Sequence, residues 1–157
     1  MFFPHYHEHI RFGSLSIDRT GISGYGGYSM VLKEMAIKDR ATVFEENLIL
    51  FVKRHRIVAG DPIPLGYRAP WIKRDSLAIA KIGKRLTHTS TEADFSNLLV
   101  NSDTRDTDCI EVHIYGPIHC RAIEYLSGSK PRQRADQVLL KSVIKKLKEI
   151  GVTVEIS

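Results

Sequence analysis

The chain has 157 residues, 43% of them hydrophobic and 26% charged, with a formal net charge of +5 and a pI near 9.3. This composition is typical of a soluble globular protein and excludes a disordered chain. It also excludes a membrane-spanning helix, because no apolar run approaches the roughly 20 residues that a bilayer requires. A chain of this length can bury a substantial core, so we predict a single domain over residues 1–157.

Strands dominate the predicted structure of the N-terminal part. Leu15 and Ile17 alternate with serines, which predicts a strand over 9–17. Four glycines within 21–27 predict a turn-rich loop over 18–27, because glycine adopts backbone angles that other residues avoid. Hydrophobic patterns and turn residues predict the elements up to residue 70: a strand at 28–33, a helical turn at 34–39, strands at 40–44 and 48–52 joined by a turn, and an extended proline-containing loop at 56–70.

Histidines precede and open the first predicted strand. If this strand begins at His5, then His5, His7, His9 and Arg11 share one face, because they are two residues apart. A row of three histidines is able to bind a divalent metal such as zinc. Chain starts fray, however, and no carboxylate completes this face. We therefore expect no metal at this position.

Helical periodicity is clearest in the C-terminal part. We predict an amphipathic helix with a basic outer face over 71–86, and a second helix that Asp136 caps and Gly151 ends. The other elements predicted there are a short helix at 93–100, a polar loop at 101–108, a strand at 109–115, a helix at 118–126 and a closing strand at 152–156. This order of elements predicts an α+β fold, with a mixed or mainly antiparallel sheet and flanking helices.

The predicted strand at 109–115 carries the residues best suited to chemistry. Apolar residues at 110, 112 and 114 share one face, and Glu111, His113 and Tyr115 share the other. These three supply a carboxylate, a base that titrates near neutrality and a hydrogen-bonding ring. They are our catalytic candidates, and the alternative is a solvated polar strand surface without a role.

Positive charge is concentrated in two segments. Nine lysines and arginines but only Asp61 and Asp75 lie between Lys53 and Arg85, and a second basic run spans 130–134. Such an excess favours anionic partners: nucleic acid, nucleotide phosphates or an acidic protein. The simpler interpretation is a solvated face and a loop.

The cysteines and the N-terminal sequence bear on the compartment. Cys109 and Cys120 are too few for a disulfide framework or a full set of zinc ligands. The first residues lack the charged region of a secretory signal, and Pro4 interrupts them. We therefore expect a cytoplasmic protein with reduced thiols and no membrane partner.

Three segments together resemble bacterial ADP-ribosyltransferase-type toxin and effector domains. They are Arg11-Phe12-Gly13-Ser14-Leu15-Ser16, the glycine- and tyrosine-rich turn that leads into Tyr25-Gly26-Gly27-Tyr28-Ser29-Met30-Val31-Leu32-Lys33, and Ile110-Glu111-Val112-His113-Ile114-Tyr115-Gly116-Pro117. The resemblance covers about a quarter of the chain. It implies an enzyme that consumes NAD as a substrate and transfers ADP-ribose to a protein or nucleic-acid acceptor, or hydrolyses NAD. A toxin of this kind would also have an acidic protein partner, such as an antitoxin.

The resemblance also implies roles for individual residues. Glu111 would be the catalytic glutamate, and His9 or Arg11 would anchor the ribose or phosphates. Ser14, Tyr25 or Tyr28 would shape the nicotinamide pocket. The chain departs from the family in having no Ser-Thr-Ser segment, and in having Cys109 where arginine-directed enzymes have Glu or Gln. Two alternatives stay open: a basic nucleic-acid-binding module or nuclease acting on RNA or DNA, and a non-catalytic protein-interaction domain.

Overall fold

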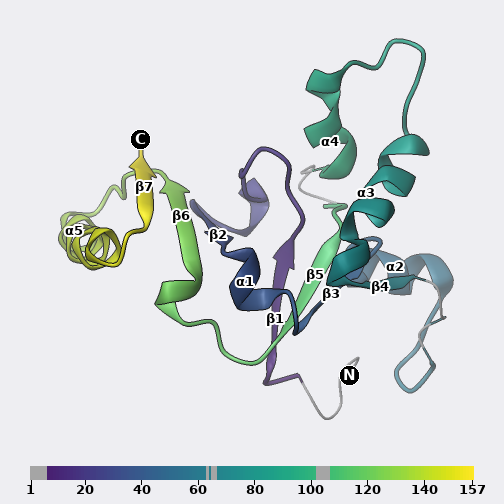
Figure 1. The fold of residues 1–157 in the computed structure, drawn as a ribbon, viewed down its shortest axis with the longest axis horizontal. Coiled ribbons are helices and arrows are strands. Elements are labelled where there is room, and N and C mark those ends of the chain that lie inside the picture. Colours follow the sequence, from purple (N-terminus) through teal and green to yellow (C-terminus); the bar gives the residue numbers. More distant parts are fainter. Residues whose placement is uncertain (1–6, 63, 65–66, 102–106) are drawn as a thin grey trace.

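Two β-sheets form the framework of the part of the chain that the computed structural model describes, residues 7–62, 64, 67–101 and 107–157 (Figure 1). The first sheet is antiparallel and has the order β1 (Ile10–Ser14), β5 (Glu111–Tyr115), β3 (Ala41–Phe44) and β4 (Arg68–Pro70). In the second, the central β6 (Ile123–Gly128) pairs antiparallel with β2 (Tyr28–Leu32) and parallel with β7 (Thr153–Ile156). The predicted α+β fold with mainly antiparallel strands is therefore confirmed.

Helices flank both sheets, and the shortest of them lies between the two (Figure 1). The α-helices are α1 (Glu34–Ile37), α2 (Leu48–His55), α3 (Arg74–Gly83), α4 (Phe95–Leu99) and α5 (Arg134–Glu149). Short 3-10 turns are η1 (Ser23–Tyr25), η2 (Trp71–Lys73), η3 (Glu92–Asp94) and η4 (Cys120–Ala122). Helix α5 lies beside β7 at one end of the molecule, and α2, α3 and α4 lie at the other (Figure 1).

The predicted helix over 71–86 corresponds to η2 followed by α3. The last helix ends as predicted, because Gly151 adopts a positive φ of 83° that favours glycine. Its predicted start was wrong. Gln133 occupies the N-cap position, and Asp136 lies within the first turn, where its negative charge complements the helix dipole.

The strand predicted at 48–52 was wrong, because this segment is the helix α2. Leu48 and Phe51 are three residues apart and both are buried, as helical periodicity requires. Asn47 caps the helix, since its Oδ1 accepts a hydrogen bond from the Ile49 amide at 2.9 Å. A run of five apolar residues is compatible with the period of a strand and with that of a helix. The Asn47 cap favours the helix.

The helix predicted at 118–126 was also wrong. Only Cys120–Ala122 form a 3-10 turn, and Ile123 begins β6. This strand is the centre of the second sheet, so its backbone pairs on both sides, and Leu126 packs with Leu147 of α5. Pairing with two strands distant in sequence overrides the local preference of the segment.

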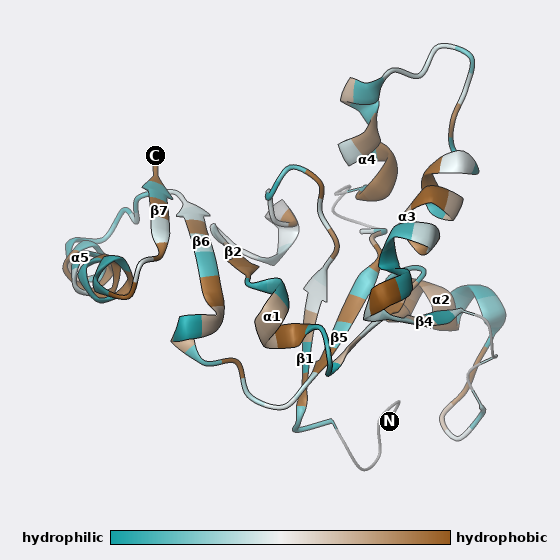
Figure 2. Cartoon of the chain, viewed as in Figure 1, coloured by the Kyte–Doolittle hydropathy of each residue, from teal (hydrophilic) through white to brown (hydrophobic). Residues whose placement is uncertain are grey.

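Separate apolar clusters support the two sheets. Ile110, Val112 and Ile114 are buried together with Val43 of β3, which confirms the apolar face predicted for the strand at 109–115. A second cluster joins β6 to α5, a helix that carries both hydrophobic and hydrophilic residues (Figure 2). Glu111, on the opposite face of β5, lines a cavity together with Val112 and Ile114.

Candidate functional site

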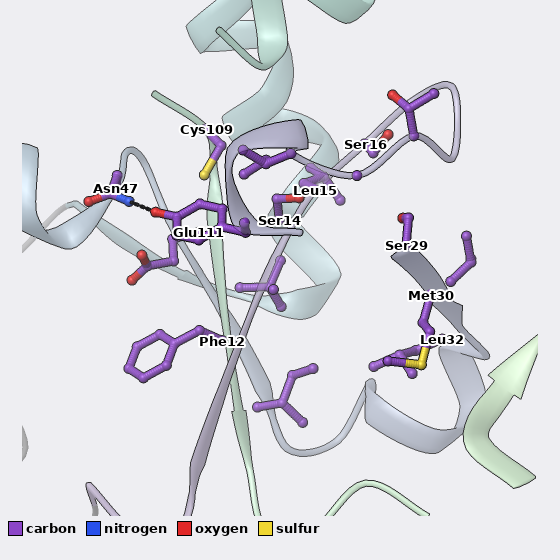
Figure 3. Close-up of a pocket in the computed structure, with 18 of the residues that line it drawn as sticks. Phe12, Ser14, Leu15, Ser16, Ser29, Met30, Leu32, Asn47, Cys109 and Glu111 are labelled. Carbon is purple, nitrogen blue, oxygen red and sulfur yellow. Dashed lines mark hydrogen bonds between the residues drawn. The ribbon is translucent and has the colours of Figure 1, made fainter. Parts of the chain in front are cut away.

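A cavity of about 700 Å³ lies between the two sheets. Its walls come from β1 and β5 of the first sheet, β2 of the second, the loop between β1 and β2, and the start of α2 (Figure 3). Four of the predicted site residues line it: Ser14, Tyr25, Tyr28 and Glu111. The volume lies within the range of about 300–1,000 Å³ that is usual for small-molecule and cofactor sites.

Glu111 is the only carboxylate among the described residues that line this cavity. Its side chain is 12% exposed, and Oε1 lies 2.6 Å from Nε2 of His113. The Leu48 amide, at the N-terminus of α2, donates a longer hydrogen bond of 3.5 Å to Oε2. The His113 imidazole and the Leu48 amide therefore fix the orientation of the carboxylate.

His113 forms a hydrogen bond with Glu111 but does not itself line the cavity. Its ring is 5% exposed and stacks on Phe44, with centroids 5.9 Å apart. Phe12 contacts the same ring edge-on at 5.2 Å. The alternation of β5 thus brings Glu111 and His113 together as predicted, with His113 holding the carboxylate in place.

Three other predicted residues lie away from the cavity. Tyr115 is half exposed at the far end of β5, and its ring contacts His9 at a centroid distance of 6.1 Å. Arg11 donates hydrogen bonds to backbone oxygens of Glu8 and Ile10 at 2.8 and 3.2 Å. The β1–β5 register pairs Ile10 with Tyr115, which places the start of β1 at the end of β5 remote from Glu111.

Arg19 lines the cavity, whereas His9 and Arg11, our candidates for the phosphate anchor, do not. It is the only lysine or arginine among the described residues that line the cavity. It lies in the loop after β1, has a positive φ of 62°, and approaches Glu124 at 3.8 Å. In the sequence, only its position in the glycine-rich loop over 18–27 indicated that Arg19 could approach a ligand.

Asp18 organises the same loop. Its Oδ1 accepts hydrogen bonds from the Thr20 hydroxyl at 2.7 Å, the Thr20 amide at 2.9 Å and the Ser16 hydroxyl at 2.7 Å. These bonds, the Thr20 hydroxyl foremost, lower the pKa of Asp18 from 3.8 to about 2, against the opposing effect of partial burial. The carboxylate therefore holds the turn that presents Arg19 and Thr20 to the cavity.

The low pKa of Asp18 predicts a defined pH dependence. Because the folded-state value lies below the unfolded one, the ionised carboxylate stabilises the fold above pH 3.8, and this contribution is lost as the pH falls through about 2. We expect the difference in unfolding free energy between wild type and Asp18→Asn to shrink over this window. Urea unfolding at a series of pH values measures it, and a constant difference would contradict the assignment.

Tyr28 depends on Gly128 for its position. The two residues face each other across the β2–β6 pair, and a Cβ atom at 128 would overlap the Tyr28 ring and lie 2.6 Å from the Gly27 carbonyl oxygen. We expect Gly128→Ala to lower the unfolding free energy by about 1–3 kcal/mol and to displace the Tyr28 ring. Gly83→Ala, at the end of α3, is the control, because its added Cβ meets no atom from outside its own helix within 4 Å, and it should not lower the urea midpoint. A Gly128→Ala midpoint equal to that of wild type would contradict this prediction.

Cys109 also lines the cavity, and its thiol is unreactive. The side chain is buried, and burial together with the nearby Glu111 carboxylate raises its pKa to about 12. A thiol is nucleophilic only as the thiolate. Cys109 is therefore a neutral wall residue at physiological pH.

The basic segment between Lys53 and Arg85 is less positive than its sequence indicates. Among the described residues, at least four of its nine cations form ion pairs: Arg54 with Glu45 and Glu46, Arg74 with Glu34 and Asp75, and both Lys81 and Arg85 with Asp108. Carboxylates from outside the segment supply most of these partners. Tertiary contacts therefore reduce the charge that this surface offers to nucleic acid.

Asp108 is the centre of a buried ionic network. Lys81 Nζ lies 2.6 Å from Asp108 Oδ1 and donates a second hydrogen bond of 2.7 Å to the Glu45 carbonyl oxygen. Arg85 bonds Asp108 Oδ2 and donates to the Leu98 carbonyl oxygen at 2.7 Å. Burial lowers the pKa of Lys81, and the bond to Asp108 opposes this effect. The network connects α3 to α4, to the end of β3 and to the segment that leads into β5.

Two further properties concern only the described part of the chain. It contains no group of three or more His, Cys, Asp or Glu side chains arranged to hold a metal ion, and His5 lies outside it. None of its helices combines the length and apolar character needed to cross a bilayer.

The fold and the cavity together describe an α+β protein with a ligand-sized pocket between two sheets. The Glu111 carboxylate, which is hydrogen-bonded to His113, projects into this pocket. No family model, no curated protein and no solved structure matches this chain.

Proposed function

We propose that the protein is an ADP-ribosyltransferase-like domain of the toxin or effector type, which uses NAD as its substrate and either transfers ADP-ribose or hydrolyses NAD. One observation carries the proposal. Glu111 and the three candidates for the nicotinamide pocket, Ser14, Tyr25 and Tyr28, come from three separate segments and line the same cavity of about 700 Å³. Convergence of distant residues on one pocket is what a binding site requires.

Glu111 is suited to stabilise a developing positive charge. When nicotinamide leaves, the bond between its nitrogen and the ribose carbon breaks, the electron pair stays with nicotinamide, and the sugar becomes positive. A carboxylate fixed by His113 and the Leu48 amide meets this charge without reorganising. The oxygen of water or of an acceptor hydroxyl then bonds to the sugar carbon, and its proton passes to the solvent.

Four other lining residues suit the other parts of such a ligand. Arg19 is placed to attract the phosphates, and the Ser14 hydroxyl and the two tyrosines offer hydrogen bonds and aromatic surface. Cys109 occupies the position where arginine-directed enzymes have a second carboxamide or carboxylate, and its thiol stays protonated. We therefore propose water or an acceptor other than arginine as the nucleophile.

Incubation of the purified protein with NAD tests the proposal. We expect release of nicotinamide, separated and quantified by liquid chromatography, together with NAD binding by calorimetry. A protein that neither binds nor consumes NAD would rule the proposal out. The same assay with candidate protein and nucleic-acid acceptors distinguishes transfer from hydrolysis.

An acidic protein partner is compatible with this proposal. The second basic segment and α5 expose seven cations to solvent: Lys130, Arg132, Arg134, Lys141, Lys145, Lys146 and Lys148. They lie at the end of the molecule remote from α3 (Figure 1). An antitoxin with an acidic surface would be attracted there, and co-purification with an acidic neighbour would support it. Nucleic-acid binding is the alternative: ion pairs occupy at least four of the nine cations of the larger basic segment, and the exposed cations of the second are open to nucleic acid as well.

A further inference from the structure

Asn47 connects three parts of the cavity wall, although sequence patterns did not single it out. It is buried and lines the cavity at the point where β3 leads into α2. Its Oδ1 accepts from the Ile49 amide at 2.9 Å, and its Nδ2 donates to the Tyr25 hydroxyl at 3.1 Å, the dashed line in Figure 3. One side chain thus links α2 to the turn η1 across the cavity.

Capping fixes the orientation of the Asn47 amide. The oxygen must face the helix N-terminus, because only an acceptor can satisfy the free amides there. The nitrogen therefore points the other way, toward Tyr25, as a donor. Aspartate or serine would cap the helix as well. Aspartate has no donor and would place a second negative charge near Glu111, and serine is too short to reach Tyr25.

Tyr25 needs such an anchor. Its side chain is 70% exposed, and η1 is a three-residue turn that a glycine with a φ of 151° follows. An exposed aromatic ring on a short turn loses rotamer freedom when it contacts a ligand, and this loss weakens binding. A hydrogen bond to a buried amide removes part of that freedom before the ligand arrives.

The same residue fixes the neighbourhood of Glu111. Asn47 sets the start of α2, and the next amide, that of Leu48, is the one that donates to Glu111 Oε2. The start of α2 therefore positions the carboxylate on one side and the Tyr25 ring on the other.

We propose that Asn47 is a positioning residue, which holds Tyr25 over the cavity and so preorganises the NAD site. The inference rests on the proposed function for the identity of the ligand, and on the hydrogen bonds of Asn47 for the positioning itself. In this proposal Tyr25 and Asn47 contribute to the affinity for NAD, and Glu111 acts in the chemical step.

A double-mutant cycle of Tyr25→Phe and Asn47→Ser tests this inference. Serine keeps the helix cap and removes only the reach to Tyr25, while phenylalanine keeps the ring and removes only the hydroxyl. We expect each single variant to raise the Kd and the KM for NAD about three- to tenfold, as loss of one neutral hydrogen bond predicts, with kcat within about twofold of wild type. The double variant should bind NAD with the same affinity as the single variant that binds it less tightly, because both substitutions remove the same hydrogen bond.

Tyr125→Phe is the matched control, since its hydroxyl donates to Glu155 at 2.7 Å outside the cavity, and its NAD affinity should equal that of wild type. Amide hydrogen exchange without ligand gives a second readout. Exchange of residues 22–27 should rise by a similar amount in Tyr25→Phe, Asn47→Ser and the double variant.

The outcomes separate the two proposals. Wild-type affinity and exchange in Asn47→Ser would overturn the positioning role, and so would additive effects in the double variant. If wild-type protein does not bind NAD, the proposed function fails, and exchange alone then decides: equal, non-additive increases support the role of Asn47, and unchanged exchange overturns it.

Discussion

Glu111→Gln should lower the rate of nicotinamide release from NAD by about 100- to 1,000-fold, with the fold and NAD binding close to those of wild type. Glutamine has the shape of glutamate and can still accept a hydrogen bond from the Leu48 amide, so the cavity wall stays in place. It carries no negative charge, however, and cannot stabilise the positive sugar. The loss should appear in kcat, because the charge develops only in the transition state.

The control for this prediction is Glu149→Gln at the end of α5, which removes a carboxylate outside the cavity. Its kcat and KM should match those of wild type. A Glu111→Gln protein that is folded, binds NAD and releases nicotinamide at the wild-type rate would remove Glu111 from the reaction. The pocket would then bind NAD without using this carboxylate.

Asp108→Ala should have the largest effect on stability. The substitution leaves the Lys81 ammonium, 8% exposed, without its carboxylate partner. Removal of one member of a buried ion pair costs about 3–5 kcal/mol, because the remaining charge is desolvated and uncompensated. Arg85 loses the same partner, but it is a third exposed and partly solvated. Urea unfolding measures the change in the free energy of unfolding.

Two further variants make this prediction specific. Asp75→Ala removes an exposed carboxylate that lies 3.6 Å from Arg74, and it should cost less than about 1 kcal/mol. Lys81→Met in the Asp108→Ala background removes the stranded charge and should recover part of the lost stability. If Asp108→Ala costs no more than Asp75→Ala, the network does not hold α3 against the segment before β5.

The placement of Glu111 beside His113 was predictable from a local pattern. The strict alternation of 109–115 placed Glu111 and His113 on one face and three apolar residues on the other, and the structure confirms that apolar face. Tyr115 belongs to the same face by period, but it projects from the end of β5, beyond the cavity. A period of two determines which face a side chain takes, and it carries no information on where along the strand the cavity lies.

The errors in the predicted elements have a common physical cause. At 48–52 a short apolar run fits both a buried strand and a buried helix, and the Asn47 cap selects the helix. At 118–126 the local pattern favours a helix, while pairing with β2 and β7 makes most of the segment a strand. The cation of the cavity was also misplaced, since Arg11 bonds backbone oxygens near the start of β1 and the loop after β1 presents Arg19 to the cavity.

The sequence by itself determined the class of the fold, the alternation of β5 and the carboxylate that projects from it. These features are local, because side-chain period and turn residues depend on neighbours a few positions away. Only the tertiary structure decided which segments face Glu111 across the cavity, which cations are neutralised by distant carboxylates, and that Asn47 reaches Tyr25. Those features depend on strand register and on contacts between residues far apart in the chain, and no local pattern encodes them.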